Sequence, residues 1–189
     1  MSFEDYKTKK SVVVVYTGDG KGKTTAGIGL MSRTLGNRQS VAFIQFIKYW
    51  GVSEHVFIRD IRGLYKDKLF FYKGGKGFYK AGDLSPEHIS DKQHKDAAEE
   101  TYNQAIKASQ NGKYDLVICD EINNAVHDGL ITEKQVKELI LNRAPGTSLC
   151  LTGRNFPAKL KGLADIITSM DKIKHHFDNQ YLANKGIDF

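Results

Sequence analysis

Short apolar runs alternate along the chain with longer segments of helical character. The run from Val12 to Tyr16 is β-branched and is closed by glycines, and comparable runs follow at 40–46, 114–121, 147–153 and 165–170. Apolar runs of this length predict buried strands. Because strands that alternate with helices build parallel sheets covered on both faces, the pattern predicts an α/β fold with a mostly parallel sheet. A ligand would bind at the carboxyl ends of these strands.

The helices between these strands are predicted from their start and stop signals. Gly36-Asn37 can end the first helix, Ser85-Pro86-Glu87 can begin the second, Thr132-Glu133-Lys134-Gln135 fits a capping box, and Asn155 can cap a short helix near Pro157. Each signal falls between two predicted strands, as the alternation requires.

Residues 47–84 fit this alternation least well. They hold nine of the twenty aromatic residues of the chain, mixed with lysines, arginines and glycines. Such a mixture can stack on a flat, charged ligand or on nucleic-acid bases. The alternative, which we favour for any single aromatic, is an edge strand at Leu69 to Tyr72 with flanking loops that pack on the core.

Composition narrows the class of protein. With 189 residues, of which 40% are hydrophobic and 26% charged, the chain has the balance of one soluble globular domain, residues 1–189. No apolar signal segment and no membrane-spanning run is found, which predicts a cytoplasmic protein without a membrane partner. Cys119 and Cys150 each lie in a strand-like run and are expected to be buried thiols.

The segment GDGKGKTT, residues 18–25, follows the first strand and opens the first helix. It resembles the phosphate-binding pattern G-x-x-x-x-G-K-[ST], except that Thr17 stands at the first position and Gly18 comes one residue late. In such a loop, backbone N–H groups converge on phosphate oxygens at the positive end of a helix. Lys23 would add a point charge to the phosphates, and Thr24 would offer a hydroxyl to Mg²⁺.

A nucleotide loop of this kind needs a second strand that ends in a carboxylate, and Asp120 and Glu121 end the run LVICDE. One of the two acids is expected to hold Mg²⁺, and the other is either a second ligand or a catalytic base. ATP hydrolysis, phosphoryl transfer and other triphosphate chemistry all use these parts. The residues alone therefore leave the reaction open.

Four segments together resemble the cob(I)alamin adenosyltransferases, or ATP:corrinoid adenosyltransferases, of the phosphate-loop fold. They are GDGKGKTT, DEINNA, LTGR and IKHHFDNQYLANKGIDF, and the similarity extends from Val12 to Phe189. The resemblance implies a RecA-like P-loop NTPase fold and a homodimer. It also implies that the 5′-deoxyadenosyl group of ATP is transferred to Co(I) of a reduced corrinoid such as cob(I)alamin, that tripolyphosphate is released, and that a reduced flavoprotein donates electrons.

The same resemblance assigns roles at the phosphate end of the site. Catalytic roles fall to Lys23, Thr24 and Glu121, and Mg²⁺ would be held by Thr24, Asp120 and Glu121. Nucleotide binding falls to Gly18, Asp19, Gly20, Lys21, Gly22, Lys23, Thr24 and Thr25.

At the corrinoid end the assigned roles are less specific. Asn123, Asn124 and Arg154 match family segments and are expected to contact the nucleotide or the corrinoid. Phe78 belongs to a segment that lies over the corrinoid in the family, and in this segment Lys80 replaces a tryptophan found in many relatives.

The adjacent pair His175 and His176 invites a metal-ligand interpretation. We do not favour it, because two neighbouring histidines without a spaced partner make a poor site. The C-terminal segment is instead expected to fold back across the site or the dimer contact.

Three other functions remain open. A P-loop ATPase or kinase would use Glu121 to position water or a hydroxyl group and, as an ATPase, would release inorganic phosphate. A nucleotide-dependent nucleic-acid-binding module is suggested by the net charge of +6 and by residues 47–84, but no recognition helix or RNP-like pattern supports a nucleic-acid partner. A corrinoid carrier without catalysis would result if Lys80 disturbs the cobalt geometry.

Overall fold

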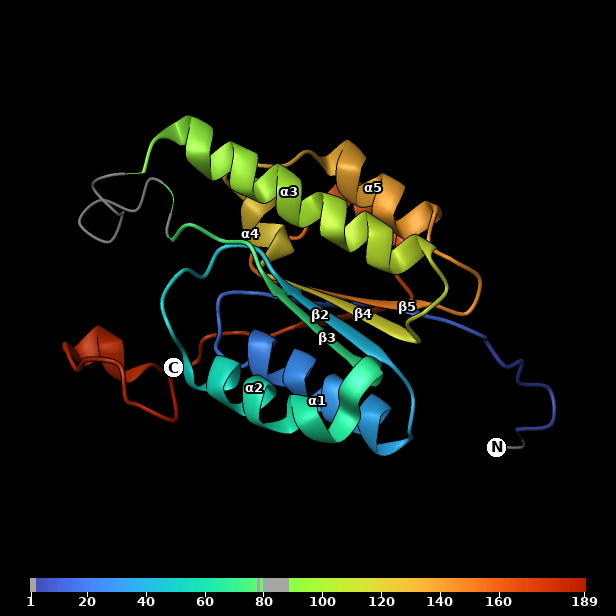
Figure 1. Ribbon diagram of the computed structural model, residues 1–189. Coiled ribbons are helices and arrows are strands. Elements are labelled where there is room, and N and C mark those ends of the chain that lie inside the picture. Colours follow the sequence, from blue (N-terminus) through green and yellow to red (C-terminus); the bar gives the residue numbers. More distant parts are fainter. Residues whose placement is uncertain (1–2, 78, 80–88) are drawn as a thin grey trace.

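A six-stranded sheet forms the centre of the protein (Figure 1). The computed structural model describes residues 3–77, 79 and 89–189. Within these residues the strands lie in the order β3-β2-β4-β5-β1-β6, and every neighbouring pair is parallel, so the α/β prediction is confirmed. The strands are β1 (Val13–Thr17), β2 (Val41–Gln45), β3 (Leu69–Lys73), β4 (Leu116–Asp120), β5 (Ser148–Thr152) and β6 (Ile166–Ser169).

Helices cover both faces of this sheet. α1 and α2 lie on one face, and α3, α4 and α5 lie on the other (Figure 1). Among the described residues, none of the helices is long and apolar enough to cross a bilayer. The helices are α1 (Lys23–Gly36), α2 (Ser53–Tyr65), α3 (Asp91–Gln110), α4 (Ile122–His127) and α5 (Glu133–Leu141), with short 3₁₀ turns η1 (Lys66–Lys68), η3 (Ala158–Leu163) and η4 (His176–Asn179).

Two hydrophobic cores lie on opposite faces of the sheet. Successive residues of a strand point to opposite faces, so Phe43 and Ile44 of β2 enter different cores. Cys119 lies in the core with α3 and α5, whereas Cys150 lies in the core with α1 and α2. Both thiols are free and fully buried, as predicted.

Helix α2 is the largest difference from the sequence prediction, which placed loops at these residues. Ile58 is its one fully buried residue, with Ile61 and Tyr65 packed partly on the core. Val56 and Phe57 are exposed, so the apolar residues of this helix do not form one clear stripe. The expected edge strand is confirmed, because β3 ends the sheet beside α2.

Two predicted helix starts also differ from the structure. α3 begins at Asp91, and its cap is Ser90, whose hydroxyl accepts the backbone N–H of Gln93. The signal at 85–87 lies outside the described residues. Asn155 adopts a positive φ of 56° and does not cap η3, which follows Pro157 directly. By contrast, Thr132 caps α5 in the predicted capping box.

Candidate active site

The loop between β1 and α1 explains why its first glycine is displaced. Thr17 completes β1 as an ordinary strand residue, and its hydroxyl accepts the backbone N–H of Phe156 at 3.2 Å. Gly18 then turns with a φ of +94°, and an added Cβ would lie 2.5 Å from the backbone oxygen of Met170. Because only glycine tolerates both the positive φ and this close approach, the glycine is required at position 18.

Lys23 lies at the centre of this loop. Its ammonium group donates hydrogen bonds to the carbonyl oxygens of Gly18, at 2.8 Å, and Gly20, at 2.5 Å. The residue is only 8% exposed, and burial lowers the pKa of Lys23, with Glu121 acting in the opposite direction. The cation is therefore held at the place where a phosphate-binding loop needs positive charge.

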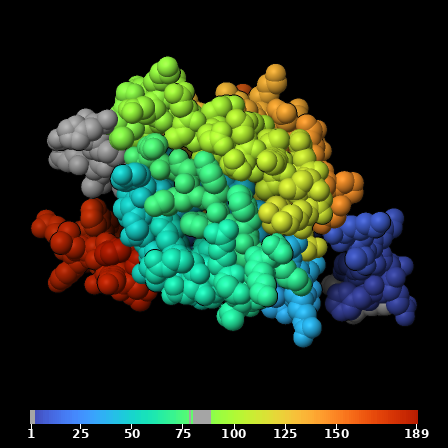
Figure 2. Space-filling view, viewed as in Figure 1, coloured from blue at the N-terminus to red at the C-terminus, as the bar shows by residue number. Residues whose placement is uncertain are grey.

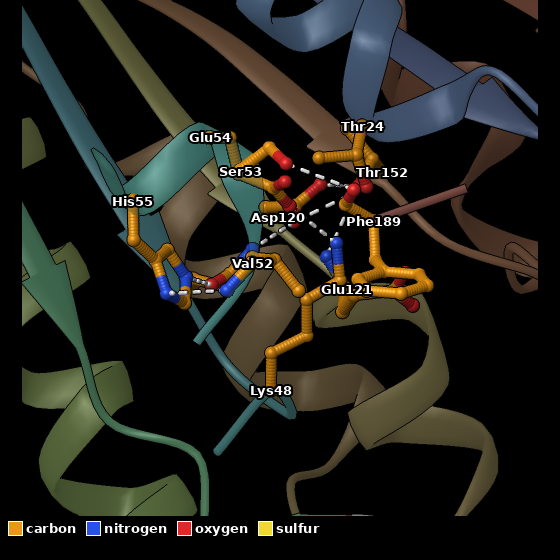
Figure 3. A network of polar contacts seen from close by, with 11 residues as sticks. Thr24, Lys48, Val52, Ser53, Glu54, His55, Asp120, Glu121, Thr152 and Phe189 are labelled. Atoms are coloured by element: carbon orange, nitrogen blue, oxygen red, sulfur yellow. Dashed lines mark hydrogen bonds and ion pairs between the residues drawn. The ribbon is translucent and has the colours of Figure 1, made fainter. Parts of the chain in front are cut away.

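A row of polar side chains crosses three strands at the carboxyl end of the sheet (Figure 3). Gln45 and Asp120 are register partners on β2 and β4, and Thr152 ends the neighbouring strand β5. All three are fully buried. Asp120 Oδ1 accepts the Thr152 hydroxyl at 2.7 Å, while Oδ2 accepts the Gln45 amide at 2.8 Å and the Thr24 hydroxyl at 3.3 Å. These three hydrogen-bond donors offset the free-energy cost of burying the Asp120 carboxylate.

Glu121 occupies a special backbone position directly after β4. It adopts a left-handed conformation with a φ of 63°, at the start of α4, and its N–H donates to the Thr152 hydroxyl at 3.0 Å. Burial and the neighbouring charge of Asp120 raise the pKa of Glu121 to about 7, although Lys48 and Lys23 act in the opposite direction. Strained backbone beside a perturbed acid is typical of a functional site.

The raised pKa of Glu121 predicts a stability effect. The folded protein binds this proton up to about pH 7, whereas the usual value is 4.5, so the contribution of Glu121 to stability falls as pH rises through that interval. Glu121→Gln is expected to raise the free energy of unfolding by roughly 2 kcal/mol at pH 8 and by little at pH 4. Thermal unfolding against pH, without nucleotide or Mg²⁺, measures this difference.

Glu100→Gln is the matched control, because Glu100 is exposed on α3. It should change the stability by no more than a few tenths of a kcal/mol across the same pH range. A constant gain for Glu121→Gln at every pH would contradict the prediction.

The donor set at this end of the sheet fits Mg²⁺. Thr24 contributes a hydroxyl and Asp120 and Glu121 contribute carboxylates, and hard oxygen ligands of this kind suit that ion. Thr24 and Glu121 line the cavity described next, while Asp120 lies behind them. Thr24 and Glu121 would therefore be the direct ligands, with Asp120 in support.

A cavity of about 1040 Å³ opens at the carboxyl ends of the strands. The loop at 19–25 and Glu121 give part of its lining a polar, phosphate-binding character. Another part of the lining is aromatic and consists of Trp50, Phe57, Tyr79, Phe177 and Phe189. The cavity is large enough for a nucleotide together with part of a second, flat ligand.

Two charged pairs contribute to the lining of this cavity. Lys48 and Glu54 form an ion pair at 2.7 Å, and both side chains are at most 19% exposed. Burial opposes the charge of Lys48, but Asp120 and Glu54 outweigh it and raise the pKa of Lys48. Lys21 of the phosphate loop pairs with Asp188, whose side chain is 6% exposed.

The C-terminal segment folds back across the site, which confirms the first of the two expected positions. Residues 186–189 line the cavity, and the Ser53 hydroxyl donates to the backbone oxygen of Phe189 at 2.9 Å. Figure 2 shows this segment, in red, beside the blue-green residues of α2 and the preceding loop. A segment remote in sequence thus forms part of the wall.

The predicted site residues do not all reach the cavity. Asp19 to Thr25, Glu121 and Arg154 line it. Gly18 lies beneath the loop, against Met170. Asn123 is fully buried, and its amide donates to the Gly153 carbonyl at 3.1 Å.

Asn124, the other asparagine matched in this segment, does line the cavity. Its side-chain oxygen accepts the N–H of Arg154 at 2.7 Å. Phe78, expected over the corrinoid, lies outside the described residues.

A third candidate ligand accompanies the histidine pair, contrary to the sequence argument. Asp188 offers a carboxylate oxygen within 4.8 Å of ligand atoms of His175 and His176. The same carboxylate pairs with Lys21, so its charge is already partly neutralised.

Several polar residues of the site have no role in the sequence prediction. Gln45 and Thr152 are signalled only by their position at strand ends, and His55, Lys48 and Glu54 lie in the region assigned to loops. Polar residues at the ends of buried strands are the signal that could have identified the first two.

Comparison with known proteins agrees with this geometry. The family model of ATP:corrinoid adenosyltransferase BtuR/CobO/CobP matches residues 9–189. A corrinoid adenosyltransferase of Sinorhizobium sp. is 32% identical over 184 residues, covering 96% of this chain and 81% of that protein. Those of Pseudomonas aeruginosa and Escherichia coli K12 are 28% and 26% identical, covering 97% and 96% of this chain and 86% and 87% of theirs. Because the family model covers nearly the whole chain and the relatives match it over similar lengths, the chain belongs to the ATP:corrinoid adenosyltransferase family.

Proposed function

We propose that the protein transfers the 5′-deoxyadenosyl group of ATP to the Co(I) centre of a reduced corrinoid and releases tripolyphosphate. One observation carries the proposal: a single cavity combines a phosphate-binding loop and an acidic pair with an aromatic lining. The family match and the names of the relatives agree with it.

The proposed chemistry takes place at a carbon atom. Co(I) of the substrate supplies the electron pair that forms the cobalt–carbon bond at C5′, while the C5′–O bond breaks and the triphosphate leaves with that bond's electrons. Lys23 and the N–H groups of the loop would stabilise the charge that grows on the leaving phosphate. No proton has to be removed from the nucleophile, so the site needs no general base.

Thr24 and Glu121, supported by Asp120, would hold Mg²⁺ beside the phosphates. When bound, the ion supplies positive charge at the phosphate oxygens. Gln45 and Thr152 would keep Asp120 in place through the hydrogen bonds described above.

The assembly and setting of the enzyme are part of the same proposal. A homodimer is supported by the edge strand β6, whose four residues are all exposed, among them Ile166 and Ile167. We also propose that residues 1–189 form one domain, that the enzyme is cytoplasmic, and that a reduced flavoprotein donates the electrons. The two free thiols support the location, because reducing compartments keep cysteines unpaired.

ATP hydrolysis is the second candidate, since Glu121 with its raised pKa lies beside the loop and could position water. An anaerobic assay with ATP, Mg²⁺ and chemically reduced cob(I)alamin separates the two. We expect a light-sensitive adenosyl–cobalt spectrum together with tripolyphosphate. Inorganic phosphate without a cobalt–carbon bond would identify an ATPase, and no reaction at all would favour a corrinoid carrier or a nucleotide-binding module.

A further inference from the structure

Gln45 is fully buried, and both ends of its amide group form hydrogen bonds. Its Nε2 donates to Asp120 Oδ2 at 2.8 Å, and its Oε1 lies 2.6 Å from His55 Nε2. The Asp120 carboxylate accepts hydrogen bonds, so it fixes which end of the amide faces it. The amide oxygen must then face His55.

His55 is thereby fixed in one tautomer. Because Gln45 presents an oxygen, His55 Nε2 must carry the proton and donate it. The other ring nitrogen, Nδ1, is left as an acceptor and faces the backbone N–H of Val52 at 3.4 Å. Burial and the charge of Lys73 lower the pKa of His55, which favours the neutral ring that this arrangement requires.

Asp120 Oδ2 accepts two hydrogen bonds of different length, and the longer one comes from Thr24, next to Lys23 of the phosphate loop. Gln45 donates at 2.8 Å, whereas the Thr24 hydroxyl donates at 3.3 Å, beyond the usual range for an O–H donor. With Gln45 in place, Thr24 is only loosely held and its oxygen can turn to another partner. Of the two side-chain hydrogen bonds that the structure shows at Oδ2, only that from Thr24 would remain without Gln45. The Thr24 hydroxyl would then be drawn to Asp120.

We propose that His55 and Gln45 are positioning residues that act through Asp120 to keep the Thr24 hydroxyl available to the Mg²⁺–nucleotide complex. The inference rests on the proposed nucleotide site and extends it to the first turn of α2. That turn is itself anchored, since Glu54 pairs with Lys48 and the His55 ring contacts Phe71 with centroids 5.5 Å apart.

The test is the binding of ATP by calorimetry, with and without Mg²⁺ and without corrinoid. His55→Phe keeps the ring contact with Phe71 but removes the donor, and Gln45→Leu removes the amide. Each is expected to weaken binding in Mg²⁺ about tenfold, as the loss of partners that orient metal ligands typically does. Binding of ATP without Mg²⁺ should change less than about twofold.

Three comparisons make the test specific. The double variant should bind no more weakly than Gln45→Leu alone, because both substitutions break one chain of hydrogen bonds. His55→Gln, which keeps a donor at similar reach, should restore most of the affinity. Arg62→Ala, on an exposed position of the same helix, should bind like the parent.

Additive effects in the double variant would overturn the proposal, as would equal losses with and without Mg²⁺. The nitrogen chemical shifts of His55 in the unmodified protein give a check that needs no variant, and a proton on Nδ1 would also overturn it. Since no corrinoid is present, these results are independent of whether the adenosyl transfer takes place.

Discussion

Lys23→Ala is expected to lower kcat/KM for adenosyl transfer by a hundredfold to a thousandfold. Lys23 is the cation at the centre of the phosphate loop, bonded to the carbonyl oxygens of Gly18 and Gly20. Loss of one well-placed donor to a developing negative charge typically costs roughly 3 kcal/mol of transition-state stabilisation. Most of the loss should fall on kcat, because the charge on the departing triphosphate grows during the reaction.

The fold should tolerate this substitution. Gly20 and Lys23 line the cavity, so water that fills the space left by the lysine side chain can donate to the freed carbonyl oxygens, and the melting temperature should fall by no more than a few degrees. Lys134→Ala, on an exposed position of α5, is the matched control and should retain full activity. Near-normal turnover by Lys23→Ala would remove the leaving-group role from this residue.

Gly18→Ala is expected to destabilise the protein by about 2–4 kcal/mol and to abolish tight ATP binding. The residue has a φ of +94°, and a new Cβ would meet the oxygen and nitrogen of Met170 at 2.5 and 2.8 Å. Both are backbone atoms, which cannot turn aside as the end of a side chain can. The loop would have to leave β6, breaking the hydrogen bond from Gly20 N–H to Met170 O.

Gly29→Ala gives the opposite expectation and serves as the control. Gly29 is exposed within α1, and an added Cβ would meet no side chain or neighbouring element within 4 Å. Alanine should therefore stabilise this helix by up to about 1 kcal/mol. Chemical denaturation measures the free energy of unfolding of both variants, and ATP binding is measured alongside. Equal stability of the two variants would contradict the role of Gly18.

The glycine-rich loop and the acidic pair of the candidate site were predictable because their signals are local. The loop and its lysine stand within eight consecutive residues, and Asp120 and Glu121 follow an apolar run directly. Strand alternation likewise predicted the parallel sheet. In each case, neighbours in sequence determine the structure, so no knowledge of strand order is needed.

The rest of the site depends on strand order and long-range contacts. Gln45 meets Asp120 only because β2 lies beside β4, and Lys21 meets Asp188 only because the C-terminal segment returns to the loop. Helix α2 has one fully buried residue, so its periodicity could not reveal that His55 would face the sheet. These contacts follow from the tertiary fold and have no local pattern.

The placement of the two cysteines on opposite faces of the sheet has a consequence for studies of motion. Burial raises the pKa of both thiols, so neither reacts with an alkylating reagent while its core is closed. The alkylation rate of Cys119 measures how often the layer under α3 and α5 opens, and that of Cys150 measures the same for the layer under α1 and α2. Equal alkylation rates would indicate that both layers open together as one cooperative unit. Unequal rates would indicate two units that open independently.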